Sequence, residues 1–325
     1  MLYRLSIGNF SCTLLLLFAF LQGSVAWAQL KQKPDPYVDS AGYHRLLNRI
    51  ANQDKTGRWP VNAPRPLKGA LLPYHRIVAY YGNLYSQHMG VLGQYPKTEM
   101  LRRLEQECAA WQKADSLTIV LPALHYIAVT AQGSPGKDGK YRHRMPDSEK
   151  DKIVQWAREI KGIAFMDIQV GHSTVQDELP HLEKYLKMPD VHLGIDPEYS
   201  MKNGDVPCHS IGTFDASDIN VAVEYLAALV KKYQLPPKVL VVHRFTQNMI
   251  TNYKDIKKVP EVQIVIDMDG FGSKTLKLAS YRQFLAREPI QFTGFKLFYK
   301  LDKPVMYKPA EILRLSPIPV YIQYQ

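Results

Sequence analysis

The alternation of short apolar runs with helical patterns is the strongest constraint on the fold of this chain. From Arg76 onward, eight runs rich in β-branched and aromatic residues cover 76–81, 118–125, 162–169, 191–196, 238–243, 262–269, 292–298 and 319–324. Between them, helical periodicity covers 98–113, 147–161, 174–186, 216–233, 248–257, 275–286 and 309–315. This order predicts an α/β fold, the (β/α)8 TIM barrel, with a doubly wound open sheet as the alternative.

No helical pattern follows the eighth run, so another segment must cover the last strand. Residues 29–75 are rich in proline and contain one helical stretch at about 40–53. Its apolar residues Tyr43, Leu46, Leu47 and Ile50 recur at helical spacing. We expect this N-terminal helix to substitute for the missing eighth helix and to pack against the first and last strands. The expected domains are a signal peptide at 1–28, the extension at 29–75 and the barrel at 76–325.

The first 28 residues have the pattern of a secretory signal peptide. A basic residue, Arg4, precedes the apolar run 14–21, and Ala26-Trp27-Ala28 supplies small residues at a cleavage site. The apolar run is short for a membrane span, although an uncleaved N-terminal anchor is the alternative. We therefore expect a secreted or periplasmic protein with no stable membrane span after cleavage.

Charge and cysteine content narrow the classes of partner. Without residues 1–28 the chain keeps 40 basic and 30 acidic side chains, a moderately basic balance. The lysines are scattered and no block of five like charges occurs, which disfavours nucleic-acid binding. Only Cys108 and Cys208 would remain, which allows one disulfide or two free thiols.

Polar residues fall on one face of nearly every predicted strand, close to its carboxyl end. Residues two apart in a strand share a face, and the polar members are His125, Asp167, Gln169, Asp196, Glu198, His243, Asp267, Asp269, Lys296 and Gln323. In a closed barrel this face points inward, at the end where barrel enzymes carry their sites. The alternative interpretation is a salt-bridge network that satisfies itself.

These residue types suit acid/base catalysis on a polar substrate without an organic cofactor. Glu198 follows the fourth strand and is the predicted general acid, while Asp267 or Asp269 is the predicted base or nucleophile. A rim charge at Glu198 and helix capping by the two aspartates are the alternatives. The predicted substrate-binding residues are Tyr81, His125, Asp167, Gln169, Asp196, His243, Lys296 and Gln323. Lys296 is suited either to pairing with Asp267 or Asp269 or to binding an anionic group.

Seven strings near the strand ends carry a resemblance to known proteins. They are 76–82, 162–171, 193–199, 241–245, 264–272, 292–299 and 320–325. The chain resembles a group of secreted bacterial barrel proteins of unassigned function and, more distantly, barrel glycoside hydrolases. In that clan an acid/base Glu follows the fourth strand, as Glu198 does here. The retaining members also carry a nucleophilic Glu after the seventh strand, where this chain has Lys296.

That departure favours an inverting mechanism over a retaining one. The fourth and sixth strands lie two apart, so carboxylates on Glu198 and on Asp267 or Asp269 would be separated by about 7–9 Å. The predicted function is a secreted hydrolase of envelope or extracellular polysaccharide. Two alternatives remain: a non-catalytic glycan-binding barrel, and a phosphodiesterase-like hydrolase with a divalent metal held by Asp167, Asp196, Asp267 and His243. The sequence contains no HxH or HExxH motif in support of the metal.

Overall fold

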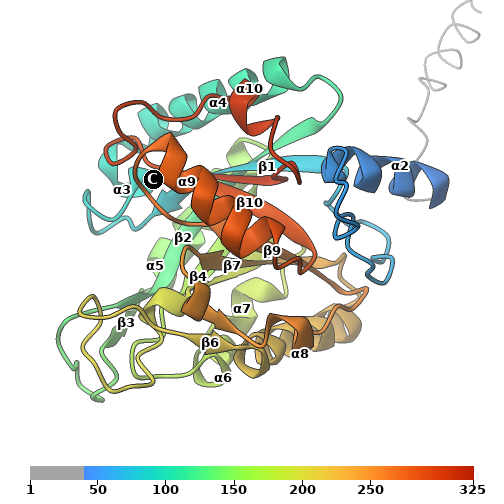
Figure 1. Ribbon diagram of the computed structural model, residues 1–325. Coiled ribbons are helices and arrows are strands. Elements are labelled where there is room, and N and C mark those ends of the chain that lie inside the picture. Colours follow the sequence, from blue (N-terminus) through green and yellow to red (C-terminus); the bar gives the residue numbers. More distant parts are fainter. Residues whose placement is uncertain (1–39) are drawn as a thin grey trace, which may run out of the picture.

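The computed structural model describes residues 40–325 of the 325-residue chain (Figure 1). The expected signal peptide at 1–28 lies outside the described residues and stays a prediction. Within the described part of the chain, no helix is both long enough and apolar enough to cross a membrane. Among the same residues, Cys108 is half-buried and Cys208 is exposed, and both are free thiols.

Eight parallel strands form a closed barrel. They are β1 (His75–Gly82), β2 (Ile119–Ala131), β4 (Ile163–Ile168), β5 (Val191–Ile195), β7 (Lys238–Arg244), β9 (Val262–Met268), β10 (Phe292–Leu297) and β11 (Tyr321–Tyr324). Each strand pairs with the next, and β1 pairs in parallel with both β2 and β11, which closes the ring. The predicted barrel is confirmed, each predicted run overlaps one of these strands, and the open-sheet alternative is excluded.

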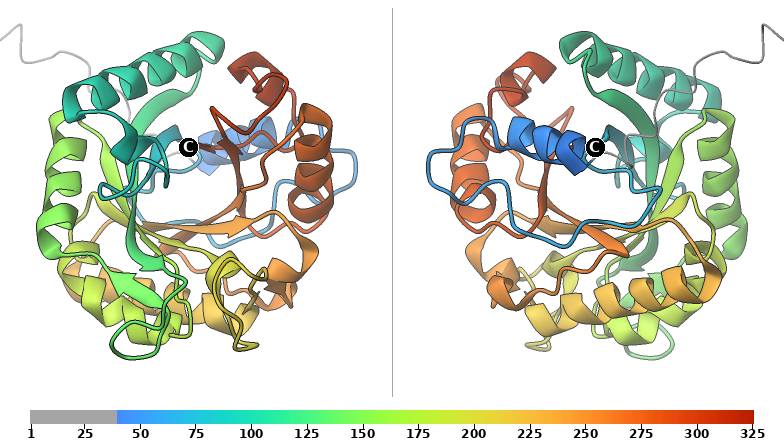
Figure 2. Two further views of the ribbon diagram at one scale, coloured as in Figure 1. Left: turned by 90° about the vertical axis from the view of Figure 1, so that its left-hand side faces the viewer. Right: turned by 90° about the vertical axis from the view of Figure 1, so that its right-hand side faces the viewer.

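Helices surround the ring of strands, as the left-hand view of Figure 2 shows. They are α3 (Val91–Gln94), α4 (Lys97–Ala114), α5 (Asp147–Glu159), α6 (Val175–Glu178), η1 (Leu179–Leu182), α7 (Glu183–Leu186), α8 (Ala216–Tyr233), α9 (Lys274–Ser280), the π-helical η5 (Tyr281–Ala286) and α10 (Pro309–Ile312). One predicted helix, 174–186, is divided into α6, η1 and α7, with Pro180 near the start of the 3-10 turn.

The predicted helix at 248–257 is wrong. This segment lies among η3 (Gln247–Met249), β8 (Ile250–Thr251) and η4 (Tyr253–Asp255), and β8 pairs with β6 (Phe214–Asp215). Asn252 has a left-handed backbone with φ of 53°, which a continuous right-handed helix excludes. The Asn252 amide donates to Asp215 Oδ2 at 2.6 Å, and Arg244 donates to carbonyls of the preceding loop. These tertiary contacts hold the segment as a loop.

The N-terminal helix α2 (Ser40–Ala51) forms where the sequence predicts it and lies beside the first and last strands. Its Leu47 and Ile50 pack on the interior cluster that includes Ile77 of β1 and Tyr321 of β11. Ile50 also accepts a backbone hydrogen bond from Ile318, just before β11. The helix lies across the amino-terminal end of the barrel, in front of the strands in the right-hand view of Figure 2.

The outer face of β11 is covered by other elements than α2. Ile322 and Tyr324 belong to the outer core cluster together with Trp111 of α4 and Ile312 of α10. The Trp111 indole donates to the Tyr324 hydroxyl at 2.9 Å, and α4 contacts α10. The helices α4 and α10 therefore cover the position that an eighth helix would occupy. The helix α2 covers the amino-terminal end of the barrel instead.

The loop after β2 is held in place by a buried ion-pair cluster. It returns through β3 (Arg142–Arg144), which pairs antiparallel with the end of β2. Glu178 is fully buried and accepts from Arg142 Nε at 2.7 Å and from Arg144 Nε at 2.6 Å. A third bond to Glu178 comes from Ser173 Oγ at 2.6 Å. These contacts fix the loop against α6, beside the carboxyl end of the barrel.

Candidate functional site

The barrel interior carries ionisable side chains that come from most of the strands. His125, Asp167, His243 and Asp267 are each 0% exposed, and Lys296 is 2% exposed. They belong to β2, β4, β7, β9 and β10 in turn. The inward direction and the carboxyl-end position that the strand periodicity predicts for the polar face are both observed.

Two glycines make room for these groups inside the barrel. A Cβ on Gly194 of β5 would lie 2.3 Å from Asp167 Oδ1 and 2.4 Å from His125 Nε2. A Cβ on Gly294 of β10 would lie 2.5 Å from Asp267 Oδ1. Side-chain atoms do not approach one another so closely, so any larger residue at these positions would displace the polar groups. Glycine is therefore required for a polar interior of this density.

His243 lies at the centre of the interior network. Its Nε2 is 3.6 Å from Asp167 Oδ2, and its Nδ1 is 3.0 Å from Asp269 Oδ2 and 3.7 Å from Asp267 Oδ2. Lys296 Nζ forms an ion pair with Asp269 Oδ1 at 2.8 Å. Of the two aspartates that the sequence offers as partners for Lys296, Asp269 is thus the one that binds it.

Tyr81 and His125 complete the network on the side of β1 and β2. The Tyr81 hydroxyl donates to Asp167 Oδ2 at 3.0 Å, and its ring lies 3.9 Å from Lys296 Nζ in a cation–π contact. His125 Nδ1 is 2.6 Å from the Tyr321 hydroxyl, which also accepts from Gln323 Nε2 at 2.8 Å. The interior is a connected set of polar contacts, and it agrees in part with the interpretation as a self-satisfied network.

The network separates the protonation states of its carboxyl groups. Burial opposes ionisation of Asp269, but the positive charges of Lys296 and His243 outweigh it and lower its pKa. For His243, burial disfavours the imidazolium, yet the Asp167 and Asp269 carboxylates outweigh it and raise the pKa. Burial raises the pKa of Asp267 to about 7, because the cations near it compensate less fully. Ionised and neutral carboxyl groups therefore lie side by side.

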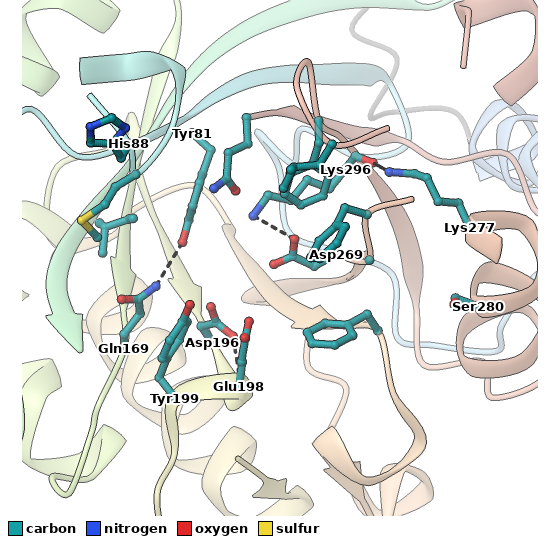
Figure 3. A pocket seen from close by; sticks show the side chains of 18 of the residues that line it. Tyr81, His88, Gln169, Asp196, Glu198, Tyr199, Asp269, Lys277, Ser280 and Lys296 are labelled. Carbon is teal, nitrogen blue, oxygen red and sulfur yellow. Dashed lines mark hydrogen bonds and ion pairs between the residues drawn. The ribbon is translucent and has the colours of Figure 1, made fainter. Parts of the chain in front are cut away.

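A cavity of about 520 Å³ opens above this network at the carboxyl end of the strands (Figure 3). Six of the predicted site residues line it: Tyr81, Gln169, Asp196, Glu198, Asp269 and Lys296. Figure 3 shows Asp196 and Glu198 on one side of the cavity and the Lys296–Asp269 ion pair on the other. The cavity is the size of a small-ligand site, and charged groups face it from two sides.

Glu198 is a carboxyl group of this cavity whose pKa is raised close to neutral pH. It lies in η2 (Pro197–Tyr199), where Asp196 caps the turn by accepting from the Glu198 backbone amide at 3.0 Å. Burial raises the pKa of Glu198 to about 7, and the negative charge of Asp269 adds to the effect. Asp196 is also raised, mainly by burial. Two carboxyl groups with raised pKa values thus face Asp269, whose pKa is lowered.

The other five predicted residues do not line the cavity. His125, Asp167, His243, Asp267 and Gln323 are fully buried one layer deeper, among the strands. Four of them, His125, Asp167, His243 and Gln323, were expected to contact a substrate directly. This expectation is corrected, because they lie beneath the residues that line the cavity and support them. The reason is position along the strand, since Gln169 and Asp269 each follow their buried counterparts by two residues. For the same reason Asp269, and not Asp267, is the aspartate that faces the cavity.

Aromatic side chains form much of the remaining wall. Phe271 and Phe298 line the cavity together with Tyr199 and Phe245. The candidate residues did not include Tyr199 and Phe245. Both follow a strand by a few residues, after β5 and β7, and this position was the available signal. Flat apolar faces beside carboxyl groups suit the stacking of sugar rings.

The metal ligands expected from the sequence are only partly brought together. Asp167 and His243 lie with His125 in a group whose ligand atoms are all within 4.8 Å of one another. Asp196 and Asp267 are outside this group. The residues that could hold a cation within the described part of the chain are therefore His125, Asp167 and His243, a set with one more histidine and fewer carboxylates than predicted.

Comparisons with known proteins give a fold likeness and no family. No protein-family model matches the sequence, and no curated protein matches it. The resemblance to secreted barrel proteins therefore stays an expectation.

Among solved structures, the chain is similar to a Bacillus subtilis mannanase, at 12% identity and a TM-score of 0.41 over 89% of this chain and 86% of that chain. A Parabacteroides distasonis sugar phosphate isomerase/epimerase matches at 12% identity and a TM-score of 0.35, over 81% of this chain and 90% of that one. A dihydropteroate synthase from Burkholderia cenocepacia matches at 10% identity and a TM-score of 0.37, over 78% and 86%. Likenesses this loose assign no reaction to the chain.

Proposed function

We propose that this protein is an exported hydrolase that cleaves glycosidic bonds in an extracellular or cell-envelope polysaccharide. One observation carries the proposal: Glu198, with a pKa raised to about 7, faces the ion-paired Asp269 across a cavity of about 520 Å³. Pairs of carboxyl groups whose environments drive their pKa values apart are the arrangement that glycoside hydrolysis uses. Export is proposed from the signal-peptide pattern of residues 1–28.

The roles follow from the protonation states. Glu198 is protonated at and below neutral pH and donates a proton to the leaving oxygen of the glycosidic bond. Asp269 is held ionised by Lys296 at 2.8 Å and activates the attacking water. Glu198 and Asp269 follow β5 and β9, which are separated by one strand, β7. Carboxyl groups that follow strands two apart leave room for a water between them, so inversion rather than a covalent intermediate is the proposed outcome.

The walls of the cavity fit a sugar chain. Tyr199, Phe245 and Phe271 offer aromatic faces, and Gln169 and Asp196 offer groups that bond to hydroxyls. Lys296 carries a positive charge at the same wall, which would favour a sugar with an acidic substituent. The substrate class that these groups support is a neutral or acidic polysaccharide.

The test is the release of reducing sugar from a panel of neutral and acidic polysaccharides. We expect wild-type turnover on at least one of them, and a loss of about 100-fold to 10,000-fold in Glu198→Gln and in Asp269→Asn. Glu224→Gln is the matched control, because Glu224 is exposed on α8 and far from the cavity in the fold. Product anomers followed by NMR report the predicted inversion.

Two results would overturn the proposal. Turnover that is unchanged in both Glu198→Gln and Asp269→Asn would remove the acid/base pair. Binding of a glycan without turnover, at an affinity that these two substitutions leave unaltered, would indicate a non-catalytic glycan-binding barrel.

A further inference from the structure

We propose that His125, Asp167 and His243 bind one divalent transition-metal ion, with Zn²⁺ as the first candidate, inside the barrel beneath the cavity floor. This site is separate from the acid/base pair, and no step of the proposed hydrolysis depends on it. The three side chains come from β2, β4 and β7, and each is 0% exposed. Their ligand atoms all lie within 4.8 Å of one another.

The distances within the triad fit the edges of a coordination polyhedron. His125 Nε2 is 3.5 Å from Asp167 Oδ1, and His243 Nε2 is 3.6 Å from Asp167 Oδ2. Good N–H···O bonds are shorter, at about 2.7–3.2 Å. Two ligand atoms that are each about 2.1 Å from a tetrahedral Zn²⁺ lie about 3.4 Å apart. The triad is therefore wider than hydrogen bonding requires and close to the width that a shared ion requires.

The atoms that face one another in the triad lack hydrogen-bond partners. His125 Nε2, Asp167 Oδ1 and His243 Nε2 are buried and make no hydrogen bond. Unsatisfied polar atoms in a protein interior are costly and call for an explanation such as an ion. Three such atoms come from three separate strands and belong to side chains whose ligand atoms lie within 4.8 Å of one another, and a cation bound among them would satisfy all of them.

The outer atoms of the same side chains lie close to oxygen atoms of the kind that support metal ligands. His125 Nδ1 is 2.6 Å from the Tyr321 hydroxyl, and His243 Nδ1 is 3.0 Å from Asp269 Oδ2. Metal-bound histidines commonly direct their second nitrogen to an oxygen, which fixes the ring and its tautomer. With each Nδ1 directed toward an oxygen in this way, each Nε2 is left to coordinate once it is deprotonated. Two imidazoles and one carboxylate are a donor set that suits Zn²⁺ and neighbouring divalent ions.

Electrostatics and space both admit a cation. Asp269, whose pKa is lowered, lies 3.0 Å from His243, so a negative charge borders the triad besides that of Asp167. The buried cation Lys296 is paired with Asp269 at 2.8 Å, which reduces its repulsion of an ion in the triad. Any side chain at Gly194 would meet both Asp167 Oδ1 and His125 Nε2, so glycine at this position keeps a side chain out of the triad. The bound ion would hold Asp167, and through it the Tyr81 hydroxyl that borders the cavity.

The experiment is a metal titration of the purified protein after removal of metal with a chelator. Zn²⁺ is added in competition with a chromophoric chelator, and bound zinc is counted by elemental analysis. We expect one equivalent per chain and a rise in Tm on the order of 5 °C at a Zn²⁺ concentration about 100 times the Kd. Substitution by Co²⁺ should produce the visible absorption bands of a four-coordinate site with nitrogen and oxygen ligands.

Variants separate the triad from adventitious binding. His125→Gln and Asp167→Asn should each weaken Zn²⁺ binding by at least about 100-fold. His192→Gln is the matched control, because His192 is also buried in a barrel strand and its Nδ1 accepts from the Val239 backbone amide instead. We expect it to bind one equivalent as the wild type does.

The proposal is overturned if the wild type binds no equivalent of Zn²⁺, Co²⁺, Mn²⁺ or Fe²⁺ and shows no rise in Tm. It is also overturned if His125→Gln binds Zn²⁺ as tightly as the wild type. Should a triad variant fail to fold, the Co²⁺ spectrum of the wild type still decides, because octahedral or absent bands contradict the predicted coordination. None of these readouts depends on glycosidase activity, so the two proposals fail independently.

Discussion

Replacement of Lys296 by methionine tests whether the buried ion pair at the cavity wall is required by the fold. Lys296 and Asp269 have side chains that are 3% and 6% exposed and are joined at 2.8 Å. Removal of one partner of a buried pair leaves an uncompensated charge and costs about 3–5 kcal/mol. The lost cation–π contact with Tyr81 at 3.9 Å adds to this cost, whereas His243 still contacts Asp269 at 3.0 Å and reduces it. We expect Lys296→Met to lower the free energy of unfolding by about 3 kcal/mol.

Urea unfolding followed by tryptophan fluorescence and circular dichroism measures this loss. Lys257→Met is the matched control, because the Lys257–Glu224 pair is 58% and 59% exposed. An exposed pair contributes about 0–1 kcal/mol. In a double-mutant cycle, Lys296→Met with Asp269→Asn should recover more than about 1 kcal/mol relative to the sum of the single variants. A loss at Lys296 no larger than the loss at Lys257, or strict additivity in the cycle, would refute the reasoning.

Three further predictions concern other parts of the site and its support. Hydrolysis should fall as pH rises through about 7, because Glu198 then loses its proton. Because the pKa of Glu198 is raised in the folded protein, its contribution to stability is present below about pH 4 and is lost as pH rises through about 7. Urea unfolding at several pH values measures this dependence, which Glu198→Gln should remove. Gly194→Ala should lower the free energy of unfolding by about 1–3 kcal/mol, since its Cβ would meet Asp167 and His125. An unchanged midpoint of urea unfolding would contradict this close packing. Glu178→Ala should destabilise by about 3 kcal/mol and speed hydrogen exchange at 132–145, because it leaves Arg142 and Arg144 without their shared buried carboxylate; exchange rates equal to the wild type would show that the loop is held by other contacts.

The strands and their faces could be predicted because their signal is local. A run such as Val262–Asp269 is apolar on both sides except for Gln263, Asp267 and Asp269, and the two-residue period places all three on one face. Closure of the sheet then directs that face inward. The same reasoning placed His125, Asp167, His243 and Lys296 together, although no two of them are neighbours in the sequence.

Depth within the barrel could not be predicted from the same period. Asp267 and Asp269 share a face, yet one lies among the strands and the other borders the cavity. The level of the cavity floor depends on how far each strand extends and on the stagger between strands, which alternation does not encode. The direction that a loop takes after a strand cannot be predicted from this alternation either, so Tyr199 and Phe245 were missed.

Tertiary contacts also overrode local pattern in two places. The segment 248–257 has helical spacing, but Asn252 adopts a left-handed backbone and bonds to Asp215 across the small β6–β8 sheet. The helix α2 was located correctly from its apolar spacing. Its place at the amino-terminal end of the barrel depends on the contact between α4 and α10 over β11. That contact cannot be predicted from the sequence of any single segment.

The most direct test of the central claim is the titration of Glu198 itself. Carbon-13 NMR of protein labelled at the glutamate carboxyl groups, with Glu198→Gln to assign the signal, reports its pKa in the free protein. The arrangement of an acid buried opposite the ionised Asp269 predicts a pKa of about 7. A value of about 4.3, as for an exposed glutamate, would contradict the assignment of Glu198 as the proton donor.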